Sequence, residues 1–280
     1  MINIVTALPA EARPLRDHFK LHDKLQDAAF PVYRNADMAL IVAGPGKVAA
    51  AAATAVLAGV DNASAKHAWL NIGIAGHAHH AIGAAFIAHR ITDQASATNW
   101  YPPQILELPI PTENLCTVDR PEENYPQAAL YDMEASGFFP VACRFSSSEL
   151  VQCFKVVSDN NTQAATAVTA KLCSQLIADQ LANIEQLVNT LGGLADEVSR
   201  WHAPQPELKR ELEQLSERWH FTVTQRHQLQ QLGRRWQVLA PGKSLWLERL
   251  QDKHKASEVL QCIQQQLDAM AAGTIGTVGA

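Results

Sequence analysis

The amino-acid sequence predicts an α/β domain followed by an α-helical region. Up to about residue 160, short runs of aliphatic and β-branched residues alternate with helical stretches, as in a sheet interleaved with helices. Beyond Gly193, leucine and tryptophan recur at helical spacing instead. The 280 residues are 47% hydrophobic and 18% charged, which is enough apolar material for one sizeable core or two unequal ones.

Six apolar runs are the predicted strands of the α/β domain. Most are apolar on both sides of the alternation, as expected for a sheet that helices cover on both faces. They comprise residues 2–8, 38–43, 69–74, 84–91, 115–118 and 154–158.

Three stretches of the same domain predict helices. Residues 47–57 form an alanine-rich helix, and residues 131–139 begin a second one. A long helical pattern over residues 162–191 ends at Gly192 and Gly193, because glycine commonly follows the last turn of a helix. The chain is therefore expected to divide into an α/β domain, residues 1–191, and an α-helical extension, residues 192–280.

Three stripes of apolar residues predict the helices of the extension. They are Leu208, Leu212, Leu215 and Trp219; Leu229, Leu232, Trp236 and Leu239; and Leu260, Ile263, Leu267 and Met270. Arg234 and Arg235 stand beside Trp236, but interleaved glutamates and the near-zero net charge of this region favour a packed helical hairpin. We therefore expect no nucleic-acid partner.

Cysteine usage and hydropathy predict a cytoplasmic protein. The five cysteines form no C-x-x-C pair, and a chain of this size needs no disulfides to fold, so a reducing compartment is expected. The N-terminal residues have no basic segment before an apolar core and reach Glu11 early, unlike a signal peptide. No stretch has the roughly 18 apolar residues of a membrane-spanning helix.

Five motifs follow one another along the first two thirds of the chain. They are Pro9-Ala10-Glu11 after the first strand, Gly44-Pro45-Gly46-Lys47-Val48-Ala49-Ala50, Asn71-Ile72-Gly73-Ile74-Ala75-Gly76, Tyr125-Pro126-Gln127-Ala128 with Asp132-Met133-Glu134-Ala135, and Val156-Val157-Ser158-Asp159. In this order they resemble the purine nucleoside phosphorylase and nucleosidase superfamily, most closely its methylthioadenosine/S-adenosylhomocysteine nucleosidase branch. The resemblance covers roughly residues 1–185. It implies a phosphorylase-type mixed central sheet flanked by helices, a purine nucleoside as substrate, a homodimer, and no cofactor or metal.

The resemblance implies a role for each of four residues. Glu11 would be the general base that activates water, and Asp159 would protonate N7 of the purine. Glu134 would accept hydrogen bonds from the ribose 2′ and 3′ hydroxyls, with Met133 packed on the sugar. Carboxylates suit this chemistry, because N-glycosidic cleavage passes through a cationic, oxocarbenium-like ribose and needs a proton donor for the base.

Each of the three carboxylates also has a structural alternative. Asp159 lies at the end of an apolar strand, where open α/β sheets bind ligands, but it could instead cap the helix that follows. Glu134 could be an exposed helix residue. Glu11 could provide only the favourable negative charge of a helix first turn.

Further residues are weaker substrate-binding candidates. Ala75 and Gly76 end a strand and let a ligand approach the backbone closely. Asp119 and Arg120 follow a strand where the related proteins line their base pocket. His77 is placed near the same crevice.

The histidines after Gly76 raise the question of a metal site. His77, His79 and His80 are close in sequence, and imidazoles are common transition-metal ligands. No second cluster completes a four-ligand site, so a polar loop is the favoured interpretation and no metal is expected.

One departure from the resemblance bears on the nucleophile. Ile74 stands where phosphorylases commonly have a serine that helps to hold phosphate, and an isoleucine cannot donate to an anion. Water is therefore favoured over phosphate, although Arg13 and Lys47 could form a different phosphate clamp. The alternatives to a nucleosidase are a phosphate-dependent phosphorylase and a non-catalytic nucleoside-binding module.

Overall fold

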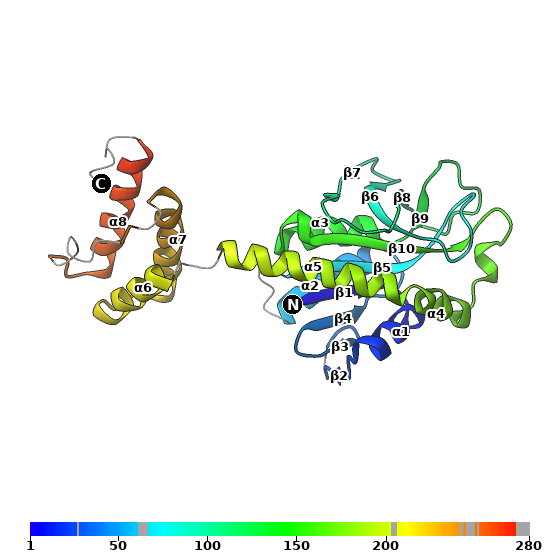
Figure 1. Ribbon diagram of the computed structural model, residues 1–280, viewed down its shortest axis with the longest axis horizontal. Coiled ribbons are helices and arrows are strands. Elements are labelled where there is room, and N and C mark those ends of the chain that lie inside the picture. Colours follow the sequence, from blue (N-terminus) through cyan, green and yellow to red (C-terminus); the bar gives the residue numbers. More distant parts are fainter. Residues whose placement is uncertain are drawn as a thin grey trace. The chain divides into compact units, whose positions relative to one another are not determined.

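The computed structural model describes residues 1–26, 28–60, 67–202, 206–240, 243–244, 250 and 252–272. The chain forms two compact units, Met1–Arg200 and Trp201–Ala280 (Figure 1). The division falls a few residues beyond the expected boundary at residue 191. Among the described residues, no helix has both the length and the apolar character needed to cross a membrane.

The first unit alternates strands and helices, as the sequence indicated. Its helices are α1 (Pro9–Phe19), α2 (Lys47–Val60), α3 (Ala135–Phe145), α4 (Ala170–Asp179) and α5 (Leu181–His202), with short 3-10 turns at Ser148–Leu150 and Ala165–Ala167. Its strands are β1 (Ile2–Thr6), β2 (Asp23–Lys24), β3 (Val32–Arg34), β4 (Met38–Val42), β5 (Ala68–Gly76), β6 (Ala85–Asp93), β7 (Asn99–Trp100), β8 (Thr112–Thr117), β9 (Leu130–Asp132) and β10 (Val151–Asp159). Each of the six predicted strands is present, and the short strands β2, β3, β7 and β9 are additional.

The strands form one mixed sheet. Its order is β10-β6-β8-β9-β5-β1-β4-β3-β2, and β10 also pairs with β5. The strands β4, β1, β5 and β10 are parallel neighbours, while β6 is antiparallel to β10 and β9 is antiparallel to β5. The parallel strands therefore end at one edge of the sheet, where Gly76 and Asp159 are paired neighbours.

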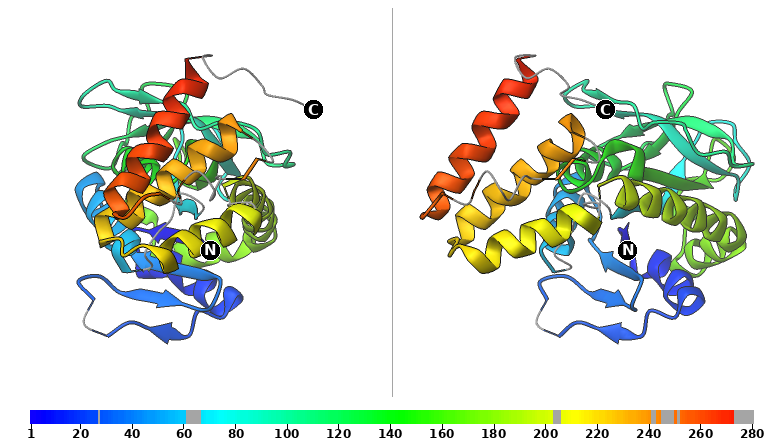
Figure 2. Two further views of the ribbon diagram at one scale, coloured as in Figure 1. Left: turned by 90° about the vertical axis from the view of Figure 1, so that its left-hand side faces the viewer. Right: turned by 60° about the vertical axis from the view of Figure 1, so that its left-hand side comes forward.

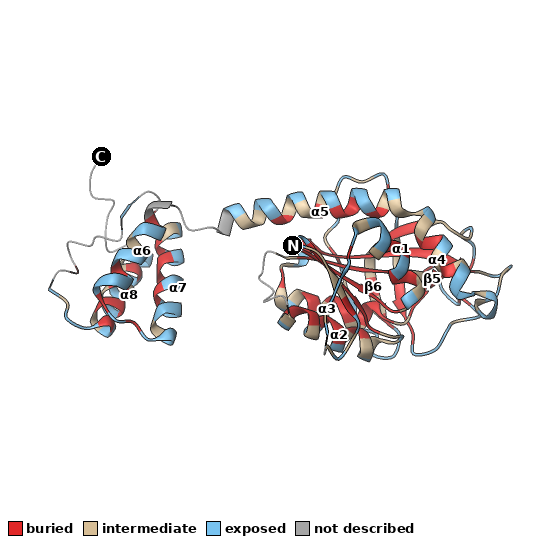
Figure 3. Ribbon diagram, turned by 90° about the horizontal axis from the view of Figure 1, so that it is seen from below, coloured by how far each residue is buried: buried red, intermediate tan, exposed pale blue. Residues whose placement is uncertain are grey.

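Helices cover both faces of the sheet, which explains why the strands are apolar throughout. On one face, α1, α4 and α5 pack in a cluster with Ile4, Leu40 and Leu70. On the other face, α2 and α3 pack with Val5 and Ile41. Figure 3 shows these strands buried between the helix layers. Successive residues of β1 thus enter opposite cores, as the two-residue period of a strand requires.

The two helices of the second face approach closely at Gly137 of α3. A Cβ atom at this position would lie 1.9 Å from the carbonyl oxygen of Lys47. We expect Gly137→Ala to lower the free energy of unfolding by about 1–3 kcal/mol or more, because backbone must move to relieve the overlap. Gly193→Ala, in α5 with no atom within 4 Å of the new Cβ, should instead be neutral or stabilising by up to about 1 kcal/mol. Chemical denaturation of both variants measures the difference, and equal stabilities would contradict the close contact.

The prediction of a helix that begins at residue 131 is wrong for the first turn. Residues 130–132 form strand β9 instead, in which Tyr131 pairs with Cys116 of β8 and with Gly76 of β5. Helix α3 begins only at Ala135. Pairing with two strands distant in sequence overrides the local helical pattern.

The prediction of a single helix over residues 162–191 is also wrong. The chain has two helices, α4 and α5, separated at Gln180, whose side chain donates a hydrogen bond to the carbonyl oxygen of Gly83 (2.8 Å). Helix α5 continues through Gly192 and Gly193 because its buried stripe continues with Leu191 and Ala195. Tertiary packing therefore outweighs the low helix propensity of glycine.

Within the described residues, the second unit has a helix at each of the three predicted stripes (Figure 2), although Leu239 of the second stripe is 43% exposed. The helices are α6 (Pro206–Arg218), α7 (Val223–Leu239) and α8 (Ala256–Ala271). Leu215, Trp236 and Leu267 are buried together in the core of this unit. The indole N–H groups of Trp219 and Trp236 donate to the carbonyl oxygens of Lys253 and Lys243, both at 2.9 Å.

Candidate active site

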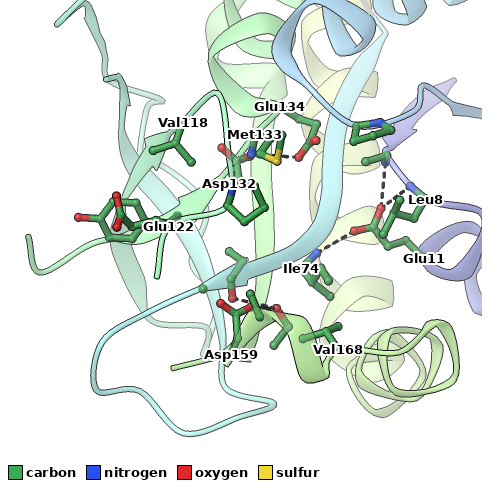
Figure 4. A pocket seen from close by; sticks show the side chains of 18 residues that line it. Leu8, Glu11, Ile74, Val118, Glu122, Asp132, Met133, Glu134, Asp159 and Val168 are labelled. Carbon is green, nitrogen blue, oxygen red and sulfur yellow. Dashed lines mark hydrogen bonds between the residues drawn. The ribbon is translucent and has the colours of Figure 1, made fainter. Parts of the chain in front are cut away.

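A cavity of about 270 Å³ lies at the carboxyl ends of β1, β5 and β10. Figure 4 shows the side chains that surround it. The lining residues are Ala7, Leu8, Glu11, Pro45, Ile74, Ala75, Gly76, Val118, Pro121, Glu122, Tyr131, Asp132, Met133, Glu134, Ser158, Asp159, Ala165 and Val168. The cavity brings together six residues that the sequence singled out, namely Glu11, Ala75, Gly76, Met133, Glu134 and Asp159.

Glu11 lies in the first turn of α1 and faces the cavity. Its Oε2 atom accepts hydrogen bonds from the backbone N–H groups of Ala7 (2.9 Å) and Leu8 (2.8 Å), and its Oε1 atom accepts one from Ile74 (3.0 Å). The side chain is only 2% exposed. Burial raises the pKa of Glu11, while the nearby Lys155 ammonium and the backbone donors oppose that rise. The carboxylate is thus held in one orientation and made more basic than a surface glutamate.

Lys155 and Asp132 form a buried ion pair behind the site. The Lys155 Nζ atom lies 2.8 Å from Asp132 Oδ2, and both side chains are almost completely buried. The Asp132 carboxylate also accepts hydrogen bonds from Thr117 Oγ1 (2.7 Å) and from the N–H of Ala135 (2.9 Å). Neither residue was predicted to act in the site. A lysine inside the apolar run 154–158 was the available signal, since a buried lysine requires a charged partner.

Glu134 precedes α3 and is 7% exposed, so it is not an exposed helix residue. Its Oε1 atom accepts a hydrogen bond from the N–H of Gly46 (2.8 Å), and its Oε2 atom accepts a longer one from Met133 (3.3 Å). Burial, and then the negative charge of Asp132, raise the pKa of Glu134 to about 7. The Lys155 ammonium limits this rise.

Asp159 ends β10 and is 7% exposed. Its Oδ1 atom accepts a hydrogen bond from Ser158 Oγ, and its Oδ2 atom accepts one from Tyr125 Oη, both at 2.5 Å. The alternative role of helix cap is excluded, because the next α-helix begins at Ala170 and is capped by Thr169. Asp159 is therefore free to face a ligand in the cavity.

Three weaker candidates lie outside the lining of the cavity. Asp119 and Arg120 are exposed, and Asp119 pairs with Lys47 at 2.9 Å. His77 is buried behind the site, where its backbone N–H donates to the carbonyl oxygen of Asp159 (3.0 Å). Lys47 is held by Asp93 as well as Asp119, and Arg13 is exposed, so neither cation reaches the cavity.

The histidine loop brings three potential metal ligands together. One ligand atom each from His77, His80 and Glu113 lies within 4.8 Å of the others. However, His77 Nδ1 accepts hydrogen bonds from the N–H groups of His79 and His80, both at 3.0 Å. This places the ring proton on Nε2, where a metal would need a lone pair. Burial lowers the pKa of His77 to about 4, so the ring is neutral near pH 7. The trio fits a metal poorly because of the Nε2 proton, and not because of the charge of the ring.

The cavity lining is rich in carboxyl groups. Five carboxylates contribute to it, from Glu11, Glu122, Asp132, Glu134 and Asp159. Among the described residues, none of those that line the cavity is a lysine, arginine or histidine. Such a site favours a substrate that becomes positively charged during its reaction, and it disfavours an anion such as phosphate.

The sequence matches no protein-family model and no curated protein sequence. Solved structures do resemble the chain. A mutant of Helicobacter pylori MTAN with 5′-methylthioadenosine in its active site is 13% identical with a TM-score of 0.57, covering 67% of this chain and 97% of that one. The 5′-methylthioadenosine nucleosidase of Arabidopsis thaliana is 17% identical with a TM-score of 0.57, covering 69% and 96%.

A third similar structure is that of a hydrolase that is not named for 5′-methylthioadenosine. The futalosine hydrolase of Helicobacter pylori is 13% identical with a TM-score of 0.56, covering 67% of this chain and 97% of that one. At such identities the likeness concerns the fold. The α/β unit of this chain therefore has the fold of the nucleosidases, a mixed central sheet flanked by helices.

Proposed function

We propose that this protein hydrolyses the N-glycosidic bond of a purine nucleoside. The observation that carries the proposal is a cavity with Glu11 and Asp159 in its lining and with no cationic side chain among the described residues that line it. The fold supports the same reaction class, since the similar structures include nucleosidases for 5′-methylthioadenosine. We therefore propose 5′-methylthioadenosine and S-adenosylhomocysteine as the first substrate candidates, with adenine and a 5-substituted ribose as products.

The proposed reaction uses one acid and one base. The Asp159 carboxyl group gives its proton to N7 of the purine as the C1′–N9 bond breaks, and the bonding electrons leave with the base. Water adds to C1′ and loses a proton to the Glu11 carboxylate. The sum is nucleoside plus water to purine plus ribose, after which solvent returns a proton from Glu11 to Asp159.

The remaining carboxylates stabilise the transition state. Glu134 accepts hydrogen bonds from the ribose hydroxyls, and Met133, which also lines the cavity, packs against the sugar. The negative charges of Asp132 and Glu134 stabilise the cationic ribose that forms between bond breaking and water addition. Ala75 and Gly76 allow the nucleoside to approach the end of β5.

Phosphate is a poor nucleophile for this cavity. Ile74 offers no hydroxyl to an anion, and its backbone N–H is already bonded to Glu11 (3.0 Å). The proposed clamp residues Arg13 and Lys47 do not line the cavity. A phosphorylase would have to bind a dianion beside the carboxylates of Glu11, Glu122 and Glu134, which electrostatic repulsion opposes.

Binding of the ribose is expected to depend on pH through Glu134. Because its pKa is raised to about 7, the ionised fraction of this carboxylate falls as the pH drops below that value. The ionised form accepts the stronger hydrogen bonds from hydroxyl groups. We expect KM to increase as the pH falls through about 7, and Glu134→Gln to have a high KM without this dependence. Steady-state kinetics across this range is the measurement, and a wild-type KM that does not change contradicts the role of Glu134.

Release of free purine tests the substrate class. The protein is incubated in phosphate-free buffer with 5′-methylthioadenosine, S-adenosylhomocysteine, adenosine or inosine, and the bases are separated by chromatography. We expect release from at least one thioether nucleoside. Release from none of the four would refute the proposed function and favour a binding module.

We also propose a homodimer. A second hollow, of about 440 Å³, shares Pro45 and Val118 with the cavity lining. It includes Val48, which is 79% exposed and therefore available to a second copy of the chain. Light scattering that gives the mass of one chain at micromolar concentration would exclude this assembly.

A further inference from the structure

Tyr125 is a buried tyrosine whose hydroxyl group contacts the proposed acid. The side chain is 6% exposed, and its Oη atom donates to Asp159 Oδ2 at 2.5 Å. Tyr125 does not line the cavity. Burial and the charge of Asp159 raise its pKa, so the phenol keeps its proton and remains a donor. The contact therefore joins a residue outside the substrate space to a residue inside it.

The surroundings of Tyr125 fix this contact. The ring packs edge-on against Tyr131 with centroids 5.8 Å apart, within a cluster of buried apolar side chains. Its backbone has a φ of +43°, a left-handed conformation that is uncommon for an aromatic residue. A Cβ at Gly76 would lie 2.5 Å from Asp159 Oδ2 and 2.8 Å from the Tyr125 ring, so only glycine leaves room for the pair.

The two hydroxyl donors leave part of the Asp159 carboxylate available. A carboxylate has about four lone-pair positions, of which Ser158 and Tyr125 each occupy one. The contact thus orients Asp159 without closing the face that lines the cavity. Hydrogen bonds from hydroxyls are stronger to the ionised carboxylate than to the neutral acid, so they strengthen as Asp159 loses its proton.

We propose that Tyr125 is a positioning residue that speeds leaving-group protonation by stabilising the carboxylate that forms on Asp159. This inference rests on the proposed function. In the step concerned, the proton moves from Asp159 to N7 while the electrons of the C1′–N9 bond move to the purine. The Tyr125 proton is not transferred. Because the hydrogen bond gains strength during the step, its removal lowers kcat and leaves KM nearly unchanged.

Tyr125→Phe removes the hydroxyl group and retains the ring. Purine release should slow by about tenfold, because a hydrogen bond to a charged group is roughly twice as strong as one to a neutral group. Tyr101→Phe is the matched control, since Tyr101 is 67% exposed and its variant should behave as wild type.

A substrate that needs no acid separates positioning from general damage. The leaving group of 4-nitrophenyl riboside departs without protonation, so Tyr125→Phe should change its hydrolysis by less than about twofold. In the Asp159→Asn background, Tyr125→Phe should have no further effect on purine release.

Three other outcomes of these experiments would each contradict the role proposed for Tyr125. Equal losses on the nucleoside and the nitrophenyl substrate would assign Tyr125 a merely structural role. Unchanged purine release in Tyr125→Phe would show that the hydroxyl group does not assist the acid. If the wild type released no purine from any nucleoside, the proposed function itself would fail, which distinguishes that failure from the two others.

Discussion

Asp159→Asn is expected to slow purine release by about 10²–10⁴-fold, the usual contribution of a general acid. Asparagine has nearly the same shape and can still accept a hydrogen bond from Ser158 or Tyr125, but it has no proton to give to the base. KM should change little. Single-turnover release of purine, followed by chromatography, measures the effect.

An exposed aspartate provides the matched control for this variant. Asp23 pairs with Arg34 at 2.8 Å, and its side chain is 59% exposed. Asp23→Asn should release purine at the wild-type rate. A rate for Asp159→Asn within about threefold of wild type would contradict the acid role, because proton donation is worth far more than that.

Lys155→Met is expected to lower the free energy of unfolding by about 3–5 kcal/mol, the typical cost of breaking a buried ion pair from one side. The Lys155 ammonium is 2.8 Å from Asp132, and it also moderates the charges of Glu11 and Glu134. Methionine has a similar length, so the change removes charge with little loss of volume. Urea denaturation of the full chain, followed at the unfolding transition of the α/β unit, measures the loss of unfolding free energy.

Removal of an exposed cation is the control that shows how strongly burial increases the stability cost of breaking an ion pair. Arg34→Met breaks a pair whose two side chains are 38% and 59% exposed, and it should cost less than about 1 kcal/mol. If Lys155→Met were as stable as Arg34→Met, the buried charge of Asp132 would not depend on Lys155. The proposal that Lys155 compensates the buried negative charge of Asp132 would then be incorrect.

The strands could be predicted because their signals are local, whereas Glu11, Glu134 and Asp159 were singled out through the resemblance carried by the five motifs. A strand buried on both faces is a short apolar run, and such runs mark β1, β4, β5 and β10 without knowledge of the rest. Asp159 follows the run 154–158 directly, and Glu11 follows the run 2–8 after two residues, at the edge where ligands bind in open α/β sheets. Their convergence on one cavity follows from the parallel pairing of β1, β5 and β10.

The missed features depend on partners distant in sequence. Strand β9 exists because Tyr131 pairs with Cys116 and Gly76, which no local pattern indicates. Helix α5 passes through Gly192 because residues on both sides of it pack on the sheet. Lys155 of β10 and Asp132 of β9 are distant in sequence, and their ion pair forms only when both strands have joined β5 in the sheet.

The dependence of turnover on phosphate tests the central claim, hydrolysis by water. Purine release from 5′-methylthioadenosine is followed as phosphate is added from zero, with Asp159→Asn as the blank, and the sugar product is identified by nuclear magnetic resonance. We predict release that does not depend on phosphate, is lost in the variant, and yields free 5-substituted ribose. Release only in the presence of phosphate, with a ribose 1-phosphate as product, would contradict this account.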